Sequence, residues 1–194
     1  MDPLAIKREE VPKRPANYAE YLLTPEGERW EIIEGIPYNM TPAPSTEHQR
    51  IIGNLHGEFY SYLKGKPCSA FVAPFDVRLL ADGKADDQVK NVVQPDISII
   101  CDPNKIDEKG CLGAPDLIVE VLSPSTAKKD RSEKLRLYRL AGVREYWIVD
   151  PLNKTVEVYD WTQHRFAEAQ VYGAEDRIQV AIFDDLVIDL GDVF

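Results

Sequence analysis

The chain has 194 residues, of which 44% are hydrophobic, and this is enough to bury the core of one domain. No run of apolar residues is long enough to span a bilayer, which argues against a membrane-spanning helix. The 33 acidic and 23 basic residues give a formal net charge of −10. Proteins that grip a phosphate backbone usually carry a basic surface, so tight duplex binding is disfavoured unless a cleft is locally basic or a metal offsets carboxylates.

The amino terminus and the cysteines bear on the compartment. Residues 1–16 lack the apolar core of a secretory signal and are predicted to form a polar arm before a single domain over residues 17–194. Cys68, Cys101 and Cys111 form no CxxC pair and are odd in number, so neither a zinc site nor a disulfide framework is expected. We therefore expect a cytoplasmic protein with reduced cysteines.

A helix and a hairpin are predicted at the start of the domain. Residues 17–23 are expected to form a short helix. Residues 29–40 have the pattern of a hairpin whose turn contains Glu34, and prolines within residues 42–44 are expected to end it. A longer helix over residues 45–64 follows, because apolar residues recur there at helical spacing behind a hydroxyl cap.

Strands dominate the middle of the chain. Residues 68–80 are predicted to be mostly extended, residues 92–101 form a second strand interrupted by Pro95, and residues 116–122 form a third. This third strand is apolar on both faces apart from Glu120, as expected for a central strand in a sheet covered on both sides. Polar connections are expected at residues 81–91 and 102–113.

A second long helix and further strands complete the prediction. The helix begins after Ser123 and ends at Ala141, with Gly142 as its carboxyl-terminal cap. Residues 145–149 and 154–161 are expected to be strands, and the tail to add an edge strand and a turn. This order predicts a mixed α/β sheet with covering helices.

Two strand-borne carboxylates are the main functional candidates. Glu120 lies in an apolar strand, where an ionised carboxylate is costly unless a cation or hydrogen-bond donors compensate it. Asp96 lies on a neighbouring strand. With the backbone carbonyl of Val121, these carboxylates offer the oxygen ligands that Mg²⁺ or Mn²⁺ prefers. The structural alternatives are a strand-end aspartate and a glutamate paired with an arginine for architecture.

Lys134 is the candidate cation. With about 100° between successive helix residues, it lies at the centre of the apolar face that includes Leu137 and Tyr138. A buried ammonium needs an anion, and two partners are open. Asp130, one turn earlier, would make a simple structural pair, whereas Glu120 would let Lys134 stabilise a phosphate or an attacking water by charge. The solvent face is expected to carry Lys128, Lys129, Ser132, Arg136 and Arg139.

A family resemblance is carried by three segments: QPDISII, PDLIVEVLSPST and KKDRSEKLRLYRLAGVREYWIVDP. These segments resemble the Uma-type family of restriction endonucleases, in the PD-(D/E)XK nuclease superfamily. The resemblance spans about residues 29–160 and is most specific over residues 115–151. It implies a restriction-endonuclease-like α/β fold, a mixed sheet flanked by helices, and Mg²⁺- or Mn²⁺-dependent hydrolysis of nucleic acid, with DNA favoured over RNA.

The resemblance also implies roles for individual residues. In the superfamily an aspartate ends one strand and an acidic-x-lysine triplet lies on the next, so Asp96 and Glu120 match the two acidic positions. The triplet here reads EVL, with Leu122 where lysine is expected, and Lys134 on the following helix is the candidate replacement. Glu34 is expected to add a carboxylate at the cleft edge, with an exposed turn acid as the alternative.

Three functions remain open from the sequence. The leading hypothesis is a metal-dependent nuclease, and a homodimer is a further expectation. A catalytically silent binding or assembly domain is favoured by Leu122 and the acidic surface. A hydrolase of a smaller phosphorylated substrate is the third alternative. His48 shares a helix face with apolar residues and is expected to be partly buried. Nucleic-acid contacts are expected from Lys128, Lys129, Arg131, Lys84 and Lys90.

Overall fold

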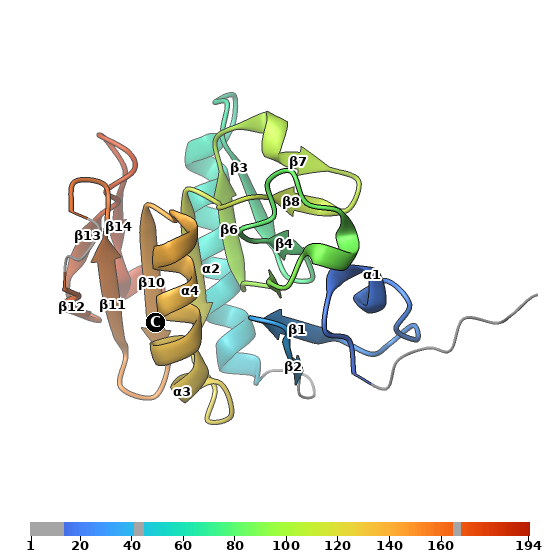
Figure 1. Cartoon of the computed structure of the whole chain (residues 1–194). Helices are drawn as coiled ribbons and strands as arrows, with labels where there is room; N and C mark the ends of the chain where they lie inside the picture. Colours follow the sequence, from blue (N-terminus) through green and yellow to red (C-terminus); the bar gives the residue numbers. More distant parts are fainter. Residues whose placement is uncertain (1–13, 41–44, 165–167) are drawn as a thin grey trace, which may run out of the picture.

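The computed structural model describes residues 14–40, 45–164 and 168–194 (Figure 1). Most of the expected amino-terminal arm and the prolines expected to end the first hairpin lie outside these residues. The described chain forms two six-stranded sheets and one two-stranded sheet. Within those same ranges, no helix is both long and apolar enough to cross a membrane.

One six-stranded sheet contains the first hairpin, near the short helix α1 (Tyr18–Tyr21). The hairpin turns at Glu34 and Gly35, which both have positive φ, 53° and 77°, as a two-residue type I′ turn requires. A glycine suits such a position because it has no Cβ. The strand order is β2 (Ile36–Asn39), β1 (Trp30–Ile33), β5 (Val92–Val93), β4 (Val77–Arg78), β8 (Gly110–Leu112) and β7 (Ile106–Asp107).

The second six-stranded sheet forms the centre of the molecule. Its central strand β9 pairs parallel with β10 and antiparallel with β6. The strand order is β12 (Gln170–Gly173), β11 (Thr155–Asp160), β10 (Glu145–Asp150), β9 (Leu117–Val121), β6 (Ile97–Ile100) and β3 (Ser69–Val72). The predicted mixed α/β sheet is thus present.

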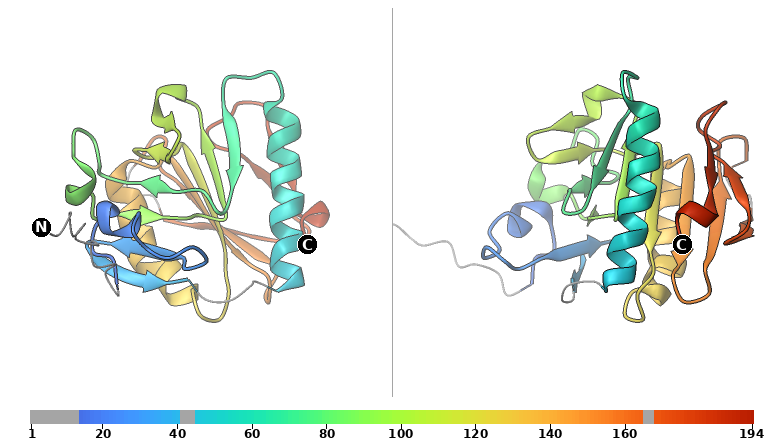
Figure 2. Two further views of the ribbon diagram at one scale, coloured as in Figure 1. Left: turned by 90° about the vertical axis from the view of Figure 1, so that its right-hand side faces the viewer. Right: turned by 180° about the vertical axis from the view of Figure 1, so that it is seen from behind.

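Helices cover both faces of this central sheet (Figure 2). Helix α2 (Thr46–Leu63) begins at Ser45, whose side chain accepts a hydrogen bond from the His48 amide, and it packs on one face. The opposite face carries a continuous helical segment made of α3 (Ala127–Lys129), a π-helical turn η3 (Asp130–Lys134) and α4 (Leu135–Ala141). Gly142 ends this segment with φ 93°.

Alternation along β9 sends its side chains to the two helical layers. Leu117, Val119 and Val121 pack in the core that contains α2. Ile118 and Leu122 pack in the core that contains α4. Because side chains alternate along a strand, Glu120 faces the same side as Ile118 and Leu122.

Several element predictions were wrong in detail. The expected single strand over residues 92–101 is two strands in different sheets, since Pro95 has no amide hydrogen for a continuous ladder. The expected polar connection at residues 102–113 contains β7 and β8. The tail forms a separate hairpin, β13 (Arg177–Gln179) with β14 (Val187–Asp189), and β12 was not predicted.

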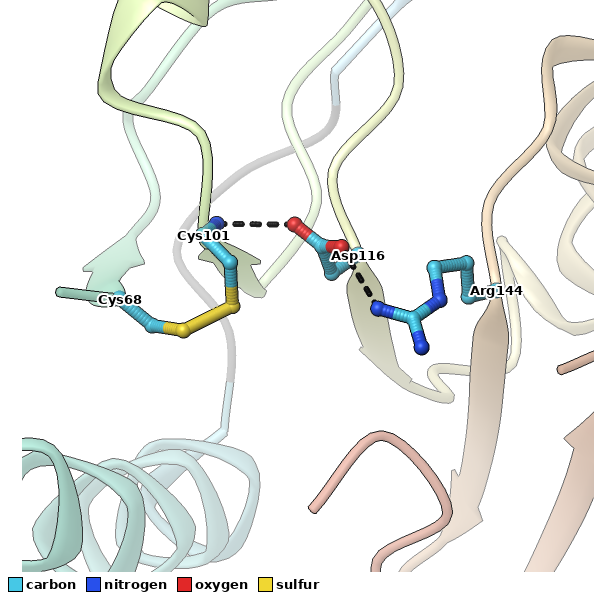
Figure 3. Close-up of a disulfide and its surroundings, with 4 residues drawn as sticks. All are labelled: Cys68, Cys101, Asp116 and Arg144. Carbon is cyan, nitrogen blue, oxygen red and sulfur yellow. Dashed lines mark hydrogen bonds and ion pairs between the residues drawn. A yellow bond between two sulfur atoms is a disulfide. The ribbon is translucent and has the colours of Figure 1, made fainter.

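The prediction of reduced cysteines is wrong for Cys68 and Cys101, which form a disulfide (Figure 3). Strand register explains the pairing: Ser69 lies opposite Ile100 in the antiparallel β3–β6 pair, so the next positions outward also face each other. Their Cα atoms are 3.9 Å apart. Sequence spacing does not reveal such a register. Cys111 is free and buried.

Candidate functional site

Strand pairing brings Asp96 and Glu120 together. Ile97 lies opposite Val119 in the antiparallel β6–β9 pair, so the next position along the ladder sets Asp96 across from Glu120. The Val121 amide donates a 2.8 Å hydrogen bond to Asp96 Oδ2. The two candidate carboxylates therefore lie at the same edge of the central sheet, and Asp96 is tied to the strand that carries Glu120.

Glu120 faces the helix after β9 and is 4% exposed. Its Oε1 accepts hydrogen bonds from Lys134 Nζ at 2.8 Å and from the Tyr138 hydroxyl at 2.6 Å. Leu122, the residue directly after β9, points to the same side and is buried among apolar side chains. An ammonium thus reaches this side of the sheet from the helix, while leucine occupies the position of the motif lysine.

Lys134 is surrounded by three carboxylates. Its Nζ lies 2.7 Å from Glu31 Oε1, 2.8 Å from Glu120 Oε1 and 3.6 Å from Asp130 Oδ1. Both partners that the sequence left open are present, and Glu31 is a third that was not considered. The Lys134 side chain is 4% exposed, so these carboxylates compensate a charge that has almost no contact with water.

The π-helical turn η3 aligns a second lysine with this cluster. Lys129 Nζ lies 2.6 Å from Glu31 Oε2, and the Lys129 side chain is 15% exposed. Residues five apart in a regular α-helix point about 140° away from each other, whereas an i→i+5 turn brings them closer to one face. The expectation that Lys129 lies on the solvent face is therefore wrong, because it assumed a regular helix.

The carboxylates of the cluster differ in their electrostatics. Burial raises the pKa of Glu31, but Lys134 and Lys129 outweigh burial and lower the pKa to about 2. Burial is also the largest effect at Glu120 and raises its pKa to about 8 despite Lys134, with Asp130 and Asp96 adding to the rise. Burial likewise raises the pKa of Asp130. Three buried carboxylates face two ammonium groups, so the cluster has an excess of negative charge that a cation or a proton would relieve.

His48 lies beside Asp96 at the start of α2. Its Nε2 is 3.4 Å from Asp96 Oδ2, and its Nδ1 is a buried atom with no hydrogen-bond partner among the described residues. Burial lowers the pKa of His48, but hydrogen bonding and charge from Asp96 outweigh burial and raise it. The sequence indicated a partly buried histidine but not its contact with Asp96, since that contact depends on how α2 packs on β6.

Glu34 is placed apart from the other candidates. Its carboxylate pairs with Arg136 at 2.7 Å, and about half of the side chain is exposed. In the part of the chain that the structure describes, no hydrogen bond or ion pair joins it to Asp96, Glu120 or Lys134. The hairpin contributes Glu31 to the cluster instead.

Glu31 was not considered in the sequence analysis, although it lies in a buried strand. Trp30, Ile32 and Ile33 are apolar neighbours of Glu31, and all four residues of β1 are buried. The signal that drew attention to Glu120, an acidic residue within an apolar strand, is therefore also present here. The strand is short, and this makes the signal weaker than in β9.

The donor chemistry at this edge fits a hard divalent cation. Asp96, Glu120 and the Val121 carbonyl are oxygen donors, and Mg²⁺ commonly uses one or two protein carboxylates and completes its shell with water. Across the described residues, no group of three or more His, Cys, Asp or Glu side chains is arranged to hold a metal. Two carboxylates and a carbonyl with waters remain compatible with that finding.

The fold is that of a restriction-endonuclease-like α/β protein. Residues 15–191 match the model of the Uma2 family, which is described as "Putative restriction endonuclease". The chain belongs to this family. The resemblance noted in the sequence is thus confirmed over nearly the whole chain.

Two relatives and one solved structure are also similar to this chain. Two uncharacterized proteins of Synechocystis are similar: slr1290 is 29% identical over 83% of this chain and 82% of its own, and sll1609 is 30% identical over 73% and 78%. A crystal structure from Anabaena variabilis, described as "a putative nuclease belonging to DUF820", aligns with a TM-score of 0.74 and 25% identity. It covers 93% of this chain and 98% of that chain.

Proposed function

We propose that this protein is a metal-dependent nuclease that hydrolyses phosphodiester bonds of nucleic acid, with DNA as the preferred substrate over RNA. The observation that carries the proposal is the contact of Lys134 with Glu120, next to an Asp96 carboxylate held by the Val121 amide. An acid, a second acid and an ammonium at one sheet edge are the groups that phosphodiester hydrolysis requires.

Each residue has a distinct part in the proposed reaction. Asp96, Glu120 and the Val121 carbonyl would hold Mg²⁺ or Mn²⁺, which when bound supplies polarisation of the phosphate and an activated water. Lys134 contributes positive charge against the negative charge that develops on the phosphate. Tyr138 donates to Glu120 and keeps its Oε1 directed toward the helix.

Substrate binding is proposed to be weak and sensitive to salt. The formal charge of −10 opposes long-range attraction to a polyanion. Two of the expected contact residues are engaged within the protein, Lys129 with Glu31 and Arg131 with Glu157. Lys128 is exposed at the start of the same helical segment and is the strongest remaining candidate for a phosphate contact.

Location and assembly are further parts of the proposal. A cytoplasmic location is proposed because it would bring the protein to nucleic acid. Disulfides are rare in that reducing compartment, so this location predicts that Cys68 and Cys101 are reduced in the cell. Counting free thiols in a rapidly quenched lysate tests this prediction. A homodimer is also proposed, and light scattering of the purified protein would measure the mass directly.

The nuclease function is tested with purified protein and labelled single-stranded DNA, duplex DNA and RNA. Cleavage is expected with Mg²⁺ or Mn²⁺ and is expected to stop with EDTA. Asp96→Asn and Glu120→Gln should each lower the rate at least about 100-fold, because each removes a proposed ligand. Cleavage that persists at the wild-type rate in both variants would assign the activity to a contaminant or to another site.

A catalytically silent binding domain is the second candidate. It is favoured by the buried Leu122 in the position of the motif lysine and by the three carboxylates that already neutralise Lys134. Isothermal titration with Mn²⁺ separates the two candidates. No heat of binding, together with no cleavage of any substrate, would favour the silent domain.

A further inference from the structure

Glu31 joins the two parts of the candidate site. Its Oε1 contacts Lys134 Nζ at 2.7 Å, and its Oε2 contacts Lys129 Nζ at 2.6 Å. Oε1 also accepts a hydrogen bond from the backbone amide of Gln94 at 3.2 Å. Gln94 lies two residues before Asp96. The buried Glu31 carboxylate therefore links the helical segment that carries Lys134 to the chain segment that contains Asp96.

This link crosses between the two large sheets. Glu31 belongs to β1 in the amino-terminal sheet, whereas Glu120 belongs to β9 in the central sheet. Lys134 contacts both carboxylates and lies where the two sheets meet the helical segment. At 1% exposure, Glu31 has both oxygens engaged by cations and little access to water.

The other partners of Lys134 are less able to hold it alone. Asp130 is 3.6 Å away, which is beyond a normal hydrogen bond. Glu120 is a proposed metal ligand, so its charge is shared with the ion in the working site. Glu31 is the close partner that carries no proposed ligand role.

We propose that Glu31 is a positioning residue: it fixes Lys134 beside Glu120 by holding Lys134 and Lys129 together on the π-helical turn. This inference rests on the nuclease function proposed above. It assigns Glu31 a role through Lys134 and without contact with substrate. It also explains the π-helical turn, since this turn directs both Lys129 and Lys134 toward the Glu31 carboxylate.

Amine labelling of the folded full-length protein, without substrate, tests the inference. A short pulse of an acetylating reagent is followed by mass spectrometry, with the exposed Lys128 as the internal reference. In Glu31→Gln, Lys134 labelling relative to Lys128 should rise about tenfold or more, because the ammonium loses one of its two close carboxylate partners and becomes more mobile. Wild-type protection of Lys134 in a folded Glu31→Gln protein would overturn the inference.

Two further variants keep the test decisive. Glu145→Gln, which removes another fully buried carboxylate in β10, should leave the labelling of Lys134 unchanged, and an equal rise there would attribute the effect to general loosening. If Glu31→Gln does not fold, Glu31→Asp decides: its side chain is one methylene shorter, so Lys134 labelling should rise about two- to fivefold. Unchanged labelling in folded Glu31→Asp would overturn the inference.

Kinetics provide a second measurement. Glu31→Gln should lower kcat about tenfold or more and leave KM for DNA within about twofold. This is the pattern expected when the Lys134 ammonium stabilises the transition state and not the bound substrate. Glu31→Asp should recover part of kcat. A wild type that cleaves nothing would remove the proposed nuclease function, while the labelling result would still decide whether Glu31 positions Lys134.

Discussion

Two glutamates that contact the same ammonium have opposite pKa shifts. Glu31 has two close lysines and a backbone amide donor, so its ionised form is favoured. Glu120 shares a single lysine with two other carboxylates, and Asp96 lies nearby. Desolvation therefore dominates at Glu120 and is outweighed at Glu31. This difference predicts opposite effects of removing each charge.

Glu120→Gln is expected to stabilise the metal-free protein at high pH. Because the pKa of Glu120 is raised to about 8 from an ordinary 4.5, the folded state retains a proton that the unfolded state releases, and stability falls as pH rises between these values. Glutamine resembles the protonated form. The variant should melt at a higher temperature than wild type near pH 9, and the difference should shrink toward pH 4.5.

Thermal melts across this pH range in EDTA measure the effect. Mn²⁺ should raise the midpoint of wild type and not that of Glu120→Gln, since only a protein that binds the ion is stabilised by it. An equal metal-dependent rise in both proteins would show that Glu120 is not a ligand.

Glu31→Gln is expected to destabilise the protein at neutral pH. The pKa of Glu31 is lowered to about 2, so its charge stabilises the fold above pH 4.5, and this stabilisation is lost as pH falls toward 2. Removing one partner of a buried ion pair costs on the order of 3–5 kcal/mol. Urea unfolding at pH 7 and at pH 3 should show a larger loss at pH 7, and a loss that does not depend on pH would contradict the assigned charge.

At the scale of elements, the helical segment after β9 departs from a regular α-helix at the point where it meets the site. The π-helical turn Asp130–Lys134 follows α3 and precedes α4, and such turns are often found at functional sites. Hydrophobic periodicity correctly predicted the helix and the inward orientation of Lys134. It did not predict the added width of the turn, which decides where Lys129 points.

A charge reversal on neighbouring lysines tests the π-helical turn. Lys129→Glu should lower the free energy of unfolding by about 3 kcal/mol or more, since it sets a carboxylate against buried Glu31. Lys128→Glu, one residue earlier and exposed, should change it by less than about 0.5 kcal/mol. Chemical unfolding of both variants compares them directly, and equal effects would indicate a regular helix with both lysines in solvent.

The two large sheets of the molecule are connected at the candidate site. The disulfide joins the chain beside β3 to the chain beside β6, at one edge of the central sheet. Cys68 and Cys101 close a loop of 33 residues in sequence, which contains β4, β5 and the segment with Asp96. Cys101 also donates its amide to Asp116, and Asp116 pairs with Arg144 (Figure 3). The covalent link therefore encloses the chain that crosses between the sheets.

Loss of this link is expected to lower global stability. A loop of this length predicts a cost of about 3–4 kcal/mol through greater freedom of the unfolded chain. The double variant Cys68→Ser/Cys101→Ser should therefore unfold at lower urea than oxidised wild type. In excess dithiothreitol the two proteins should differ by less than about 1 kcal/mol, and Cys111→Ser serves as the free-cysteine control. Similar stability under oxidising conditions would mean that the disulfide does not form in solution.

The residues alone were enough to predict the family, most helices and strands, and three residues of the candidate site. Glu120 and Lys134 were identifiable because a charge within an apolar strand or on the apolar face of a helix stands out from a local pattern. Asp96 was identified by its match to the first acidic position of the superfamily motif. The hairpin, α2 and the central strand β9 follow from turn residues, caps and periodicity, which act between near neighbours in the chain.

Which groups come into contact depends on how the elements pack. The contact of Glu31 with Lys134, that of His48 with Asp96, and the disulfide each join residues far apart in the chain. They depend on strand register, on the crossing between sheets at Pro95 and on the π-helical turn. Packing of whole elements sets these features, and a local pattern is compatible with several packings. Burial of both faces of β1, for example, depends on neighbouring elements that the sequence of β1 does not specify.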